Sequence, residues 1–205
     1  MTREDFVRQA EKKQRRNLTF SEIAGYEKQE REIAGCRCIV YSRNGSDHSK
    51  AIVYYAGGGY IRYQLPNKKS IRNLIDQIGG DLWIPLYPLY PAKDMYDGVK
   101  FGYELHRKML QTYEPDRSIP KHIAGDASED DYSGFPPTLL GFGGDEMMSG
   151  DAPDYEAAFK RSGMKDYCIH IEPDTFHAYP AFTFTPEGRK GEQQVIDYIK
   201  EKMSS

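Results

Sequence analysis

Residues 51–60, AIVYYAGGGY, decide the fold class of this chain. The unbroken apolar run 51–56 is typical of a strand that is buried on both faces of a sheet. Three glycines follow, Gly57, Gly58 and Gly59, and they allow the backbone to turn sharply and to point N–H groups into a cleft. Such N–H groups can bind a phosphate or the negative charge that develops on a carbonyl oxygen. The alternative is a tight strand-to-helix turn; the dinucleotide pattern G-x-G-x-x-G is absent here.

Strands and helices alternate along the chain on both sides of this run. Further apolar strands are predicted at 82–88, 138–144 and 166–173, and helices at 67–79, 94–112, 151–163 and 187–203. Before the run, residues 26–43 resemble an antiparallel hairpin with a turn near Ala34-Gly35, and residues 1–24 form a charged helical arm. This alternation predicts a doubly wound, mostly parallel α/β sheet with an N-terminal antiparallel hairpin, in a single domain over 25–205.

Composition and charge exclude several classes of partner. The 28 lysines and arginines against 31 aspartates and glutamates give a net charge of −3, so nucleic acid is not an expected partner. No run of 18 apolar residues indicates a membrane span, and the charged N-terminus lacks an apolar signal core, so a cytoplasmic location is expected. The spacing of Cys36, Cys38 and Cys168 fits neither a zinc site nor a C-x-x-C redox pair. We therefore predict three buried thiols, no metal and no cofactor.

Two polar residues follow predicted strands and fit a catalytic pair. Asp145 comes directly after 138–144, and His177 follows 166–173. In a parallel sheet both lie at the carboxyl ends of the strands, where ligands bind. Taken singly, Asp145 fits a helix cap or turn, and a lone histidine is most often structural. Their chain order is that of a triad acid, which fixes the imidazole tautomer, and a histidine general base.

Four ordered segments resemble the hormone-sensitive-lipase-type (fold-3) α/β hydrolases, especially the bacterial acetyl esterases. AIVYYAGGGY resembles the strand and oxyanion motif HGGG, and LYPLYPAKDMYDGVKFGYELHRKML (86–110) resembles the segment that begins YPLAPE. FPPTLLGFGGDEMMSGDAPDYEAAFKRSGM (135–164) resembles the segment that carries the catalytic acid, and IHIEPDTFHAYPAF (169–182) the one that carries the histidine. The resemblance implies a truncated α/β-hydrolase fold and a carboxylic-ester hydrolase. It assigns oxyanion N–H groups to Gly57 and Gly58, the triad acid to Asp145 and the base to His177.

Two features of the chain depart from the family pattern. Ala56 stands where the family motif has its histidine, and no G-x-S-x-G nucleophile motif occurs in the chain. By the family pattern, the interval 113–137 holds two strands, the elbow, a helix and a cap. Without the cap these need about 35–45 residues, and the interval has 25. We therefore place a missing segment near residues 117–118.

The nucleophile is unknown from the sequence. HIAGDAS superficially resembles the family's GDSAGG, but Ala127 then takes the nucleophile position and Ser128 follows it. Ser133 and Ser149 lack an elbow, and Cys168 lies within a predicted strand.

Three hypotheses of function stay open. One is hydrolysis of small acyl esters; a second is a catalytically inactive remnant that acts in binding or assembly. The third is water activated by Asp145 and His177 without a covalent intermediate. Loss of the central strand requires the 51–56 strand either to pair with the 138–143 strand or to expose an edge, which favours a homodimer through that edge.

Overall fold

The computed structural model describes residues 2–16, 20–33, 35–46, 48–59, 61–92, 101–102, 104–105, 107–108 and 131–204. The chain divides into two compact units, Met1–Arg117 and Ser118–Ser205.

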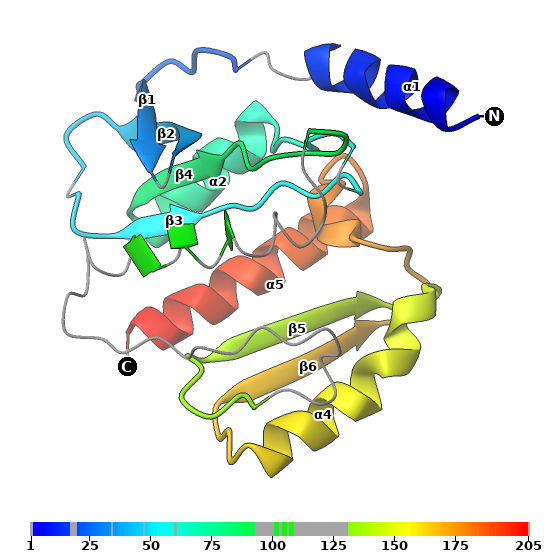
Figure 1. Cartoon of the computed structure of the whole chain (residues 1–205). Coiled ribbons are helices and arrows are strands. Elements are labelled where there is room, and N and C mark those ends of the chain that lie inside the picture. Colours follow the sequence, from blue (N-terminus) through cyan, green and yellow to red (C-terminus); the bar gives the residue numbers. More distant parts are fainter. Residues whose placement is uncertain are drawn as a thin grey trace. The chain divides into compact units, whose positions relative to one another are not determined.

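The first unit contains a four-stranded sheet in the order β1-β2-β4-β3 (Figure 1). β1 (Tyr26–Ile33) and β2 (Cys36–Arg43) form the predicted antiparallel hairpin, with Gly35 at a φ of 72° in its turn. β4 (Asp81–Pro85) pairs antiparallel with β2 and parallel with β3 (Ala51–Val53). The predicted hairpin and the predicted strand at 82–88 are therefore present. α1 (Arg3–Arg16) precedes the sheet in the chain.

The core of the first unit lies between β2, β4 and α2 (Lys68–Ile78). α2 buries an apolar face of four side chains, and the two strands contribute four more that are fully or almost fully buried: Ile71, Leu74, Ile75 and Ile78, with Ile39, Tyr41, Leu82 and Ile84. Asn67 caps the helix by accepting from the N–H groups of Lys69 and Ser70, and Gly79 ends it in the left-handed conformation. These caps confirm the helix predicted at 67–79.

The strand predicted at 51–56 is shorter than the apolar run. β3 ends at Val53, and its three residues are only half-buried. One further ladder bond, from the N–H of Tyr54 to the carbonyl oxygen of Trp83, is 2.8 Å long, after which the chain leaves the sheet. Among the described residues β3 pairs only with β4. The prediction of burial on both faces was wrong, because all three residues of β3 are only half-buried.

The second unit contains a parallel pair, β5 (Thr138–Gly143) and β6 (Tyr167–Glu172), between two helices (Figure 1). α4 (Ala152–Arg161) covers one face, where Leu140 and Ile169 pack on a cluster of Tyr132, Ala158 and Phe159. α5 (Pro186–Met203) lies along the other face. The predicted strands and helices of this unit are therefore confirmed.

The cysteines differ from one another in burial. Cys36 and Cys38 are buried, but Cys168 is exposed. Its prediction as a buried thiol was wrong, since the second residue of β6 is exposed in the structure.

Two sequence predictions concern regions that are described in part. The helix predicted at 94–112 lies largely outside the described residues, although Leu105 is buried against Cys38. Among the helices that the structure describes, none is both long and apolar enough to cross a membrane.

Candidate functional site

The glycine loop after β3 has a backbone that only glycine can adopt at its centre. Gly58 has a φ of 134°, and a Cβ there would lie 2.2 Å from the carbonyl oxygen of Arg62. Gly57, in contrast, has an ordinary φ and open space around its Cα. The N–H of Gln64 donates to the carbonyl oxygen of Gly57 at 2.7 Å and closes the loop. No hydrogen bond from the N–H of Gly57 or Gly58 is found in the described part of the chain.

Two tyrosines hold the start of this loop. The hydroxyl of Tyr87 donates to the carbonyl oxygen of Ala56, and the hydroxyl of Tyr63 donates to the carbonyl oxygen of Tyr87. The rings of Tyr63 and Tyr87 meet edge to face, with centroids 5.4 Å apart. Burial raises the pKa of Tyr63 above its usual range, so this hydroxyl keeps its proton and remains a donor. Sequence reasoning missed this brace; the 16 tyrosines were the available signal.

A carboxylate–histidine pair lies in the second unit, at the carboxyl ends of β5 and β6. Oε2 of Glu146 faces Nδ1 of His177, and Oε1 of Glu146 accepts from the N–H of Gly143 at 2.7 Å. The side chain of Glu146 is only 6% exposed, whereas that of His177 is 69% exposed. An ionised carboxylate only accepts hydrogen bonds, so Nδ1 carries the proton and Nε2 has the free lone pair. The pair therefore presents a base to solvent.

Close backbone contacts between the two loops position this pair. The N–H of Gly144 donates to the carbonyl oxygen of Glu172 at 2.8 Å, and that of Asp145 donates to the carbonyl oxygen of Thr175 at 2.9 Å. A Cβ at Gly143 would lie 2.4 Å from the carbonyl oxygen of Phe176, so only glycine permits this approach. The residue after His177, Ala178, has a φ of 56°, which is rare for a residue with a side chain.

The acid predicted from the sequence lies next to the residue that makes the contact. Asp145 is exposed and joins the site through its backbone N–H, while the neighbouring Glu146 contacts His177. Sequence reasoning missed Glu146, although two consecutive carboxylates after a strand leave the choice open. His177 and Glu146 lie in the second unit, and Gly57 and Gly58 in the first.

The serines considered as nucleophiles do not face the base where they are described. Ser149 Oγ donates to the carbonyl oxygen of Glu146 at 2.7 Å, and Ser133 Oγ donates to Oδ2 of Asp131 at 3.0 Å. The proposals for Ala127 and Ser128 concern positions outside the described residues.

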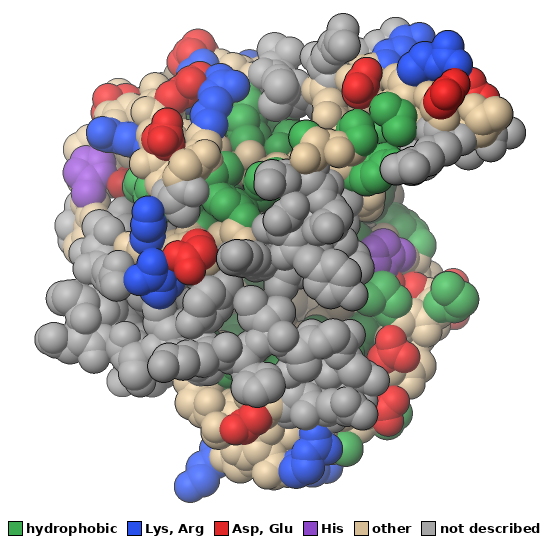
Figure 2. Space-filling view, in the orientation of Figure 1, with side chains coloured by type: hydrophobic (Ala, Val, Ile, Leu, Met, Phe, Trp, Pro, Cys, Tyr) green, Lys and Arg blue, Asp and Glu red, His purple; other side chains and the backbone are tan. Residues whose placement is uncertain are grey.

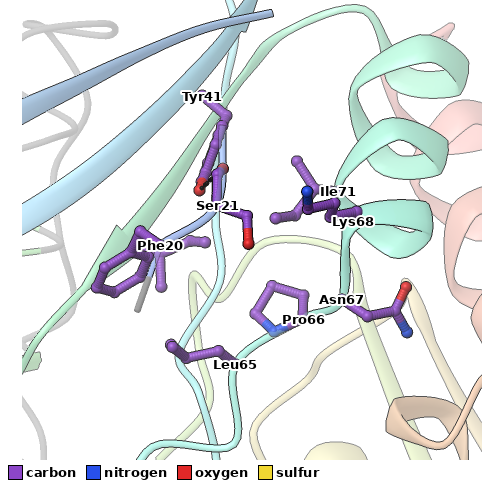
Figure 3. A pocket seen from close by; sticks show the side chains of 9 residues that line it. Phe20, Ser21, Tyr41, Leu65, Pro66, Asn67, Lys68 and Ile71 are labelled. Atoms are coloured by element: carbon purple, nitrogen blue, oxygen red, sulfur yellow. Dashed lines mark hydrogen bonds between the residues drawn. The ribbon is translucent and has the colours of Figure 1, made fainter. Parts of the chain in front are cut away.

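Two other features were considered as sites. His48 contacts both carboxylate oxygens of the buried Asp81, at 3.1 and 3.0 Å, but Asp81 begins β4, away from the glycine loop that follows β3. A cavity of about 290 Å³ in the first unit is lined by Tyr41, Ser21, Pro66 and other residues around the start of α2 (Figure 3). The described chain brings no three metal-ligating side chains together.

Comparisons with known proteins identify the fold. No protein-family model and no curated protein sequence matches this chain. Solved structures do match: the esterase EstE5 (TM-score 0.72, 18% identity) and an esterase/lipase from an uncultured bacterium (TM-score 0.75, 18% identity) each align over 100% of this chain and 92% of their own. An esterase of the bacterial hormone-sensitive lipase family aligns over 98% of this chain and 92% of its own, with a TM-score of 0.71 and 15% identity. The chain therefore has the α/β-hydrolase fold of these esterases, as the sequence predicts.

Proposed function

We propose that this chain is a carboxylic-ester hydrolase in which Glu146 and His177 form the acid–base pair. The observation that carries the proposal is the pair itself: a buried carboxylate on Nδ1 of an exposed imidazole, at the carboxyl ends of two parallel strands. The matched structures are those of esterases and an esterase/lipase, which agrees with this chemistry.

In the proposed reaction Nε2 of His177 takes the proton of the attacking hydroxyl as its oxygen bonds to the ester carbonyl carbon. Glu146 holds the ring orientation and stabilises the imidazolium that forms. The carbonyl oxygen that becomes negative needs N–H donors, and the sequence predicts those of Gly57 and Gly58 for that role. His177 then returns the proton to the departing alkoxide, which leaves as an alcohol. If water attacked, the acyl group is released as the carboxylic acid; if a side-chain hydroxyl attacked, a water molecule then releases the acid from the acylated side chain by the same proton transfers. The substrate is a small acyl ester, and the reaction needs no cofactor.

The test of this function is turnover of p-nitrophenyl acetate. We expect His177→Ala to lower kcat/KM about a hundredfold or more, because the general base is lost. His48→Ala is the matched control, since His48 is also exposed and paired with a carboxylate. Equal turnover by the wild-type chain and His177→Ala would overturn the proposal.

The assignment of the acid is tested in the same assay. Glu146→Gln keeps the shape of the side chain but removes the charge beside Nδ1, and we expect a loss of about a hundredfold or more. Asp145→Asn changes an exposed side chain and leaves its backbone N–H in place, so we expect less than a threefold loss. The reverse order of effects would restore Asp145 as the acid.

A fluorophosphonate probe identifies the attacking hydroxyl. Labelling that depends on His177 identifies a serine, and peptide mapping then locates it. Turnover without labelling identifies water as the nucleophile, activated by the pair.

The second candidate function is a catalytically inactive remnant that acts in binding or assembly. The absence of G-x-S-x-G favours it, since the family's nucleophile lies in that motif. Turnover of p-nitrophenyl acetate that His177→Ala abolishes would exclude this candidate.

We also propose a cytoplasmic homodimer that pairs through the open edge of β3. β3 and β5 are end strands in the described sheets, and unpaired edges promote association. Light scattering tests the assembly: Ile52→Lys places a charge on the edge strand and should shift the dimer to monomer. A wild-type chain that is monomeric and resists proteolysis would contradict it. Cell fractionation tests the compartment.

A further inference from the structure

The second unit contains a pocket of about 360 Å³ between α5 and the face of the β5–β6 pair that α4 does not cover. Neither Glu146 nor His177 lines it. Its walls include two strand residues with apolar surface, a strand histidine and side chains of the helix: Leu139, Gly141, His170, Gln194, Val195 and Tyr198. A pocket of this size, mostly apolar with a few polar groups, is typical of a site for a small molecule.

Gly141 leaves a gap in the wall of this pocket. It lies within β5, and glycine inside a strand often marks a place where another group approaches the backbone closely. A Cβ at Gly141 would meet no described atom within 4 Å, whereas at Gly143 the carbonyl oxygen of Phe176 fills that space. The close approach at Gly143 is therefore made by the chain itself, and at Gly141 the backbone is open to a ligand.

His170 gives the wall a hydrogen-bond acceptor. Its side chain is 37% exposed, and its Nε2 lies 3.0 Å from Oε2 of Glu172. Because a carboxylate only accepts, Nε2 carries the proton and Nδ1 of the neutral ring has the lone pair. No hydrogen bond to Nδ1 is found among the described residues. The hydroxyl of Tyr179 donates to Oε1 of Gln194 at 3.3 Å, and that of Tyr198 is buried out of reach of a ligand.

We propose that this pocket binds a small uncharged molecule with a planar apolar body and a hydroxyl group, of the class of phenols. The hydroxyl donates to Nδ1 of His170, and the planar body lies over the bare backbone of Gly141. The occupant is uncharged because the nearby carboxylate of Glu172 is already paired with Lys190. Figure 2 shows acidic and basic side chains interspersed over the described surface of that face, which gives a charged ligand no strong attraction.

Nuclear magnetic resonance of the ¹⁵N-labelled chain tests this binding without any reaction. The probes are p-cresol and toluene, which share a ring and a methyl group and differ in the hydroxyl. At about pH 8, where a histidine is ordinarily neutral, we expect p-cresol to shift the Gly141 amide signal saturably. It should bind about fivefold more tightly than toluene, because one neutral hydrogen bond is added. Equal affinities for the two probes, or no saturable shift, would overturn the proposal.

Gly141→Val tests the place of the ring. Valine is favoured in strands, and its Cβ has open space there, so the side chain occupies the pocket without unfolding the chain. We expect p-cresol to bind at least about tenfold more weakly, with no fall in the free energy of unfolding. Cys168→Val is the matched control, because Cys168 is exposed on β6 and does not line the pocket. Unchanged affinity in Gly141→Val would place the probe elsewhere and overturn the proposal.

His170→Phe tests the hydroxyl contact. Phenylalanine keeps a ring in the wall and removes the acceptor, so p-cresol should bind only as tightly as toluene, while the affinity for toluene is kept. His48→Phe is the matched control, because His48 is also an exposed histidine beside a buried carboxylate. Equal losses for both probes in His170→Phe would mean that the histidine only supports the wall. These measurements use no ester, so their outcome is independent of turnover by Glu146 and His177.

Discussion

The glycine loop after β3 and the Glu146–His177 pair after β5 and β6 place their functional groups in different ways. In the loop the proposed functional atoms are backbone N–H groups, and the side chains of Tyr63 and Tyr87 support the backbone. In the pair the functional atoms are side chains, and backbone contacts between two loops support them. Glycine therefore has a different purpose in each region. Gly58 permits an unusual φ, and Gly143 permits the close approach of the carbonyl oxygen of Phe176.

The largest effect is expected at Gly58. Gly58→Ala adds a Cβ 2.2 Å from the carbonyl oxygen of Arg62 at a φ of 134°, so the clash and the backbone strain add together. We expect the free energy of unfolding to fall by about 3 kcal/mol or more, measured by urea denaturation.

Gly57→Ala is the control for this change, because its Cβ meets nothing within 4 Å. It should alter the free energy of unfolding by less than about 0.5 kcal/mol and keep the backbone N–H. Equal losses in the two variants would show that the loop has no special conformation at Gly58.

The next effect is expected at Gly143, where the clash acts without an unusual φ. Gly143→Ala places a Cβ 2.4 Å from the carbonyl oxygen of Phe176, so the two loops must separate. We expect a loss of about 2 kcal/mol in the free energy of unfolding and a larger proportional loss of esterase turnover. Gly141→Ala, in the same strand with open space, is the control. If the free energy of unfolding fell as expected but turnover did not change, the close approach would stabilise the fold without positioning the site.

Local signals explain what the sequence predicts well. Asn67 and Gly79 bound α2 because capping depends on a few neighbouring residues. The strand at 51–56 was overpredicted because apolarity reports burial, and Ala56 is buried in a loop cluster with Tyr63 and Leu89 rather than in the sheet. An apolar run thus marks the core but does not mark where the strand ends.

Which carboxylate contacts His177 could not be chosen from the sequence, for a different reason. Asp145 and Glu146 are consecutive carboxylates, and which of them reaches His177 depends on contacts with a loop about 30 residues away in the chain. The N–H of Asp145 bonds to Thr175, and this contact leaves Glu146 to contact the imidazole. Such a long-range choice leaves no local pattern.

A smaller effect is expected from the tyrosine brace. Tyr87→Phe removes the hydroxyl that donates to the carbonyl oxygen of Ala56 and keeps the ring against Tyr63. We expect a loss of about 1 kcal/mol in the free energy of unfolding, because a single neutral hydrogen bond is removed. Thermal denaturation measures it, with Tyr55→Phe, whose hydroxyl bonds to the carbonyl oxygen of Gly102, as the comparison. A loss no larger than experimental scatter would mean that ring packing alone supports the loop.

The last effect is pH-dependent and concerns Glu172, which ends β6 before the loop that carries His177. Hydrogen bonds from Lys190 at 2.5 Å and from His170 at 3.0 Å lower the pKa of Glu172 to about 2 from its ordinary 4.5. Because the pKa in the folded state is depressed, the ionised carboxylate stabilises the fold fully above about pH 4.5. This contribution is lost as the pH falls toward 2.

The pH dependence of unfolding measures this contribution. In Glu172→Gln the free energy of unfolding should fall less steeply between pH 4.5 and 2 than in the wild-type chain, when both are followed by urea denaturation. The exposed Glu187 in the first turn of α5 supplies the control, Glu187→Gln, which should follow the wild-type curve. Parallel curves for the wild-type chain and Glu172→Gln would show that the end of β6 owes its stability to backbone contacts alone. The loop that carries His177 would then be supported by backbone contacts, without a contribution from the charge of Glu172.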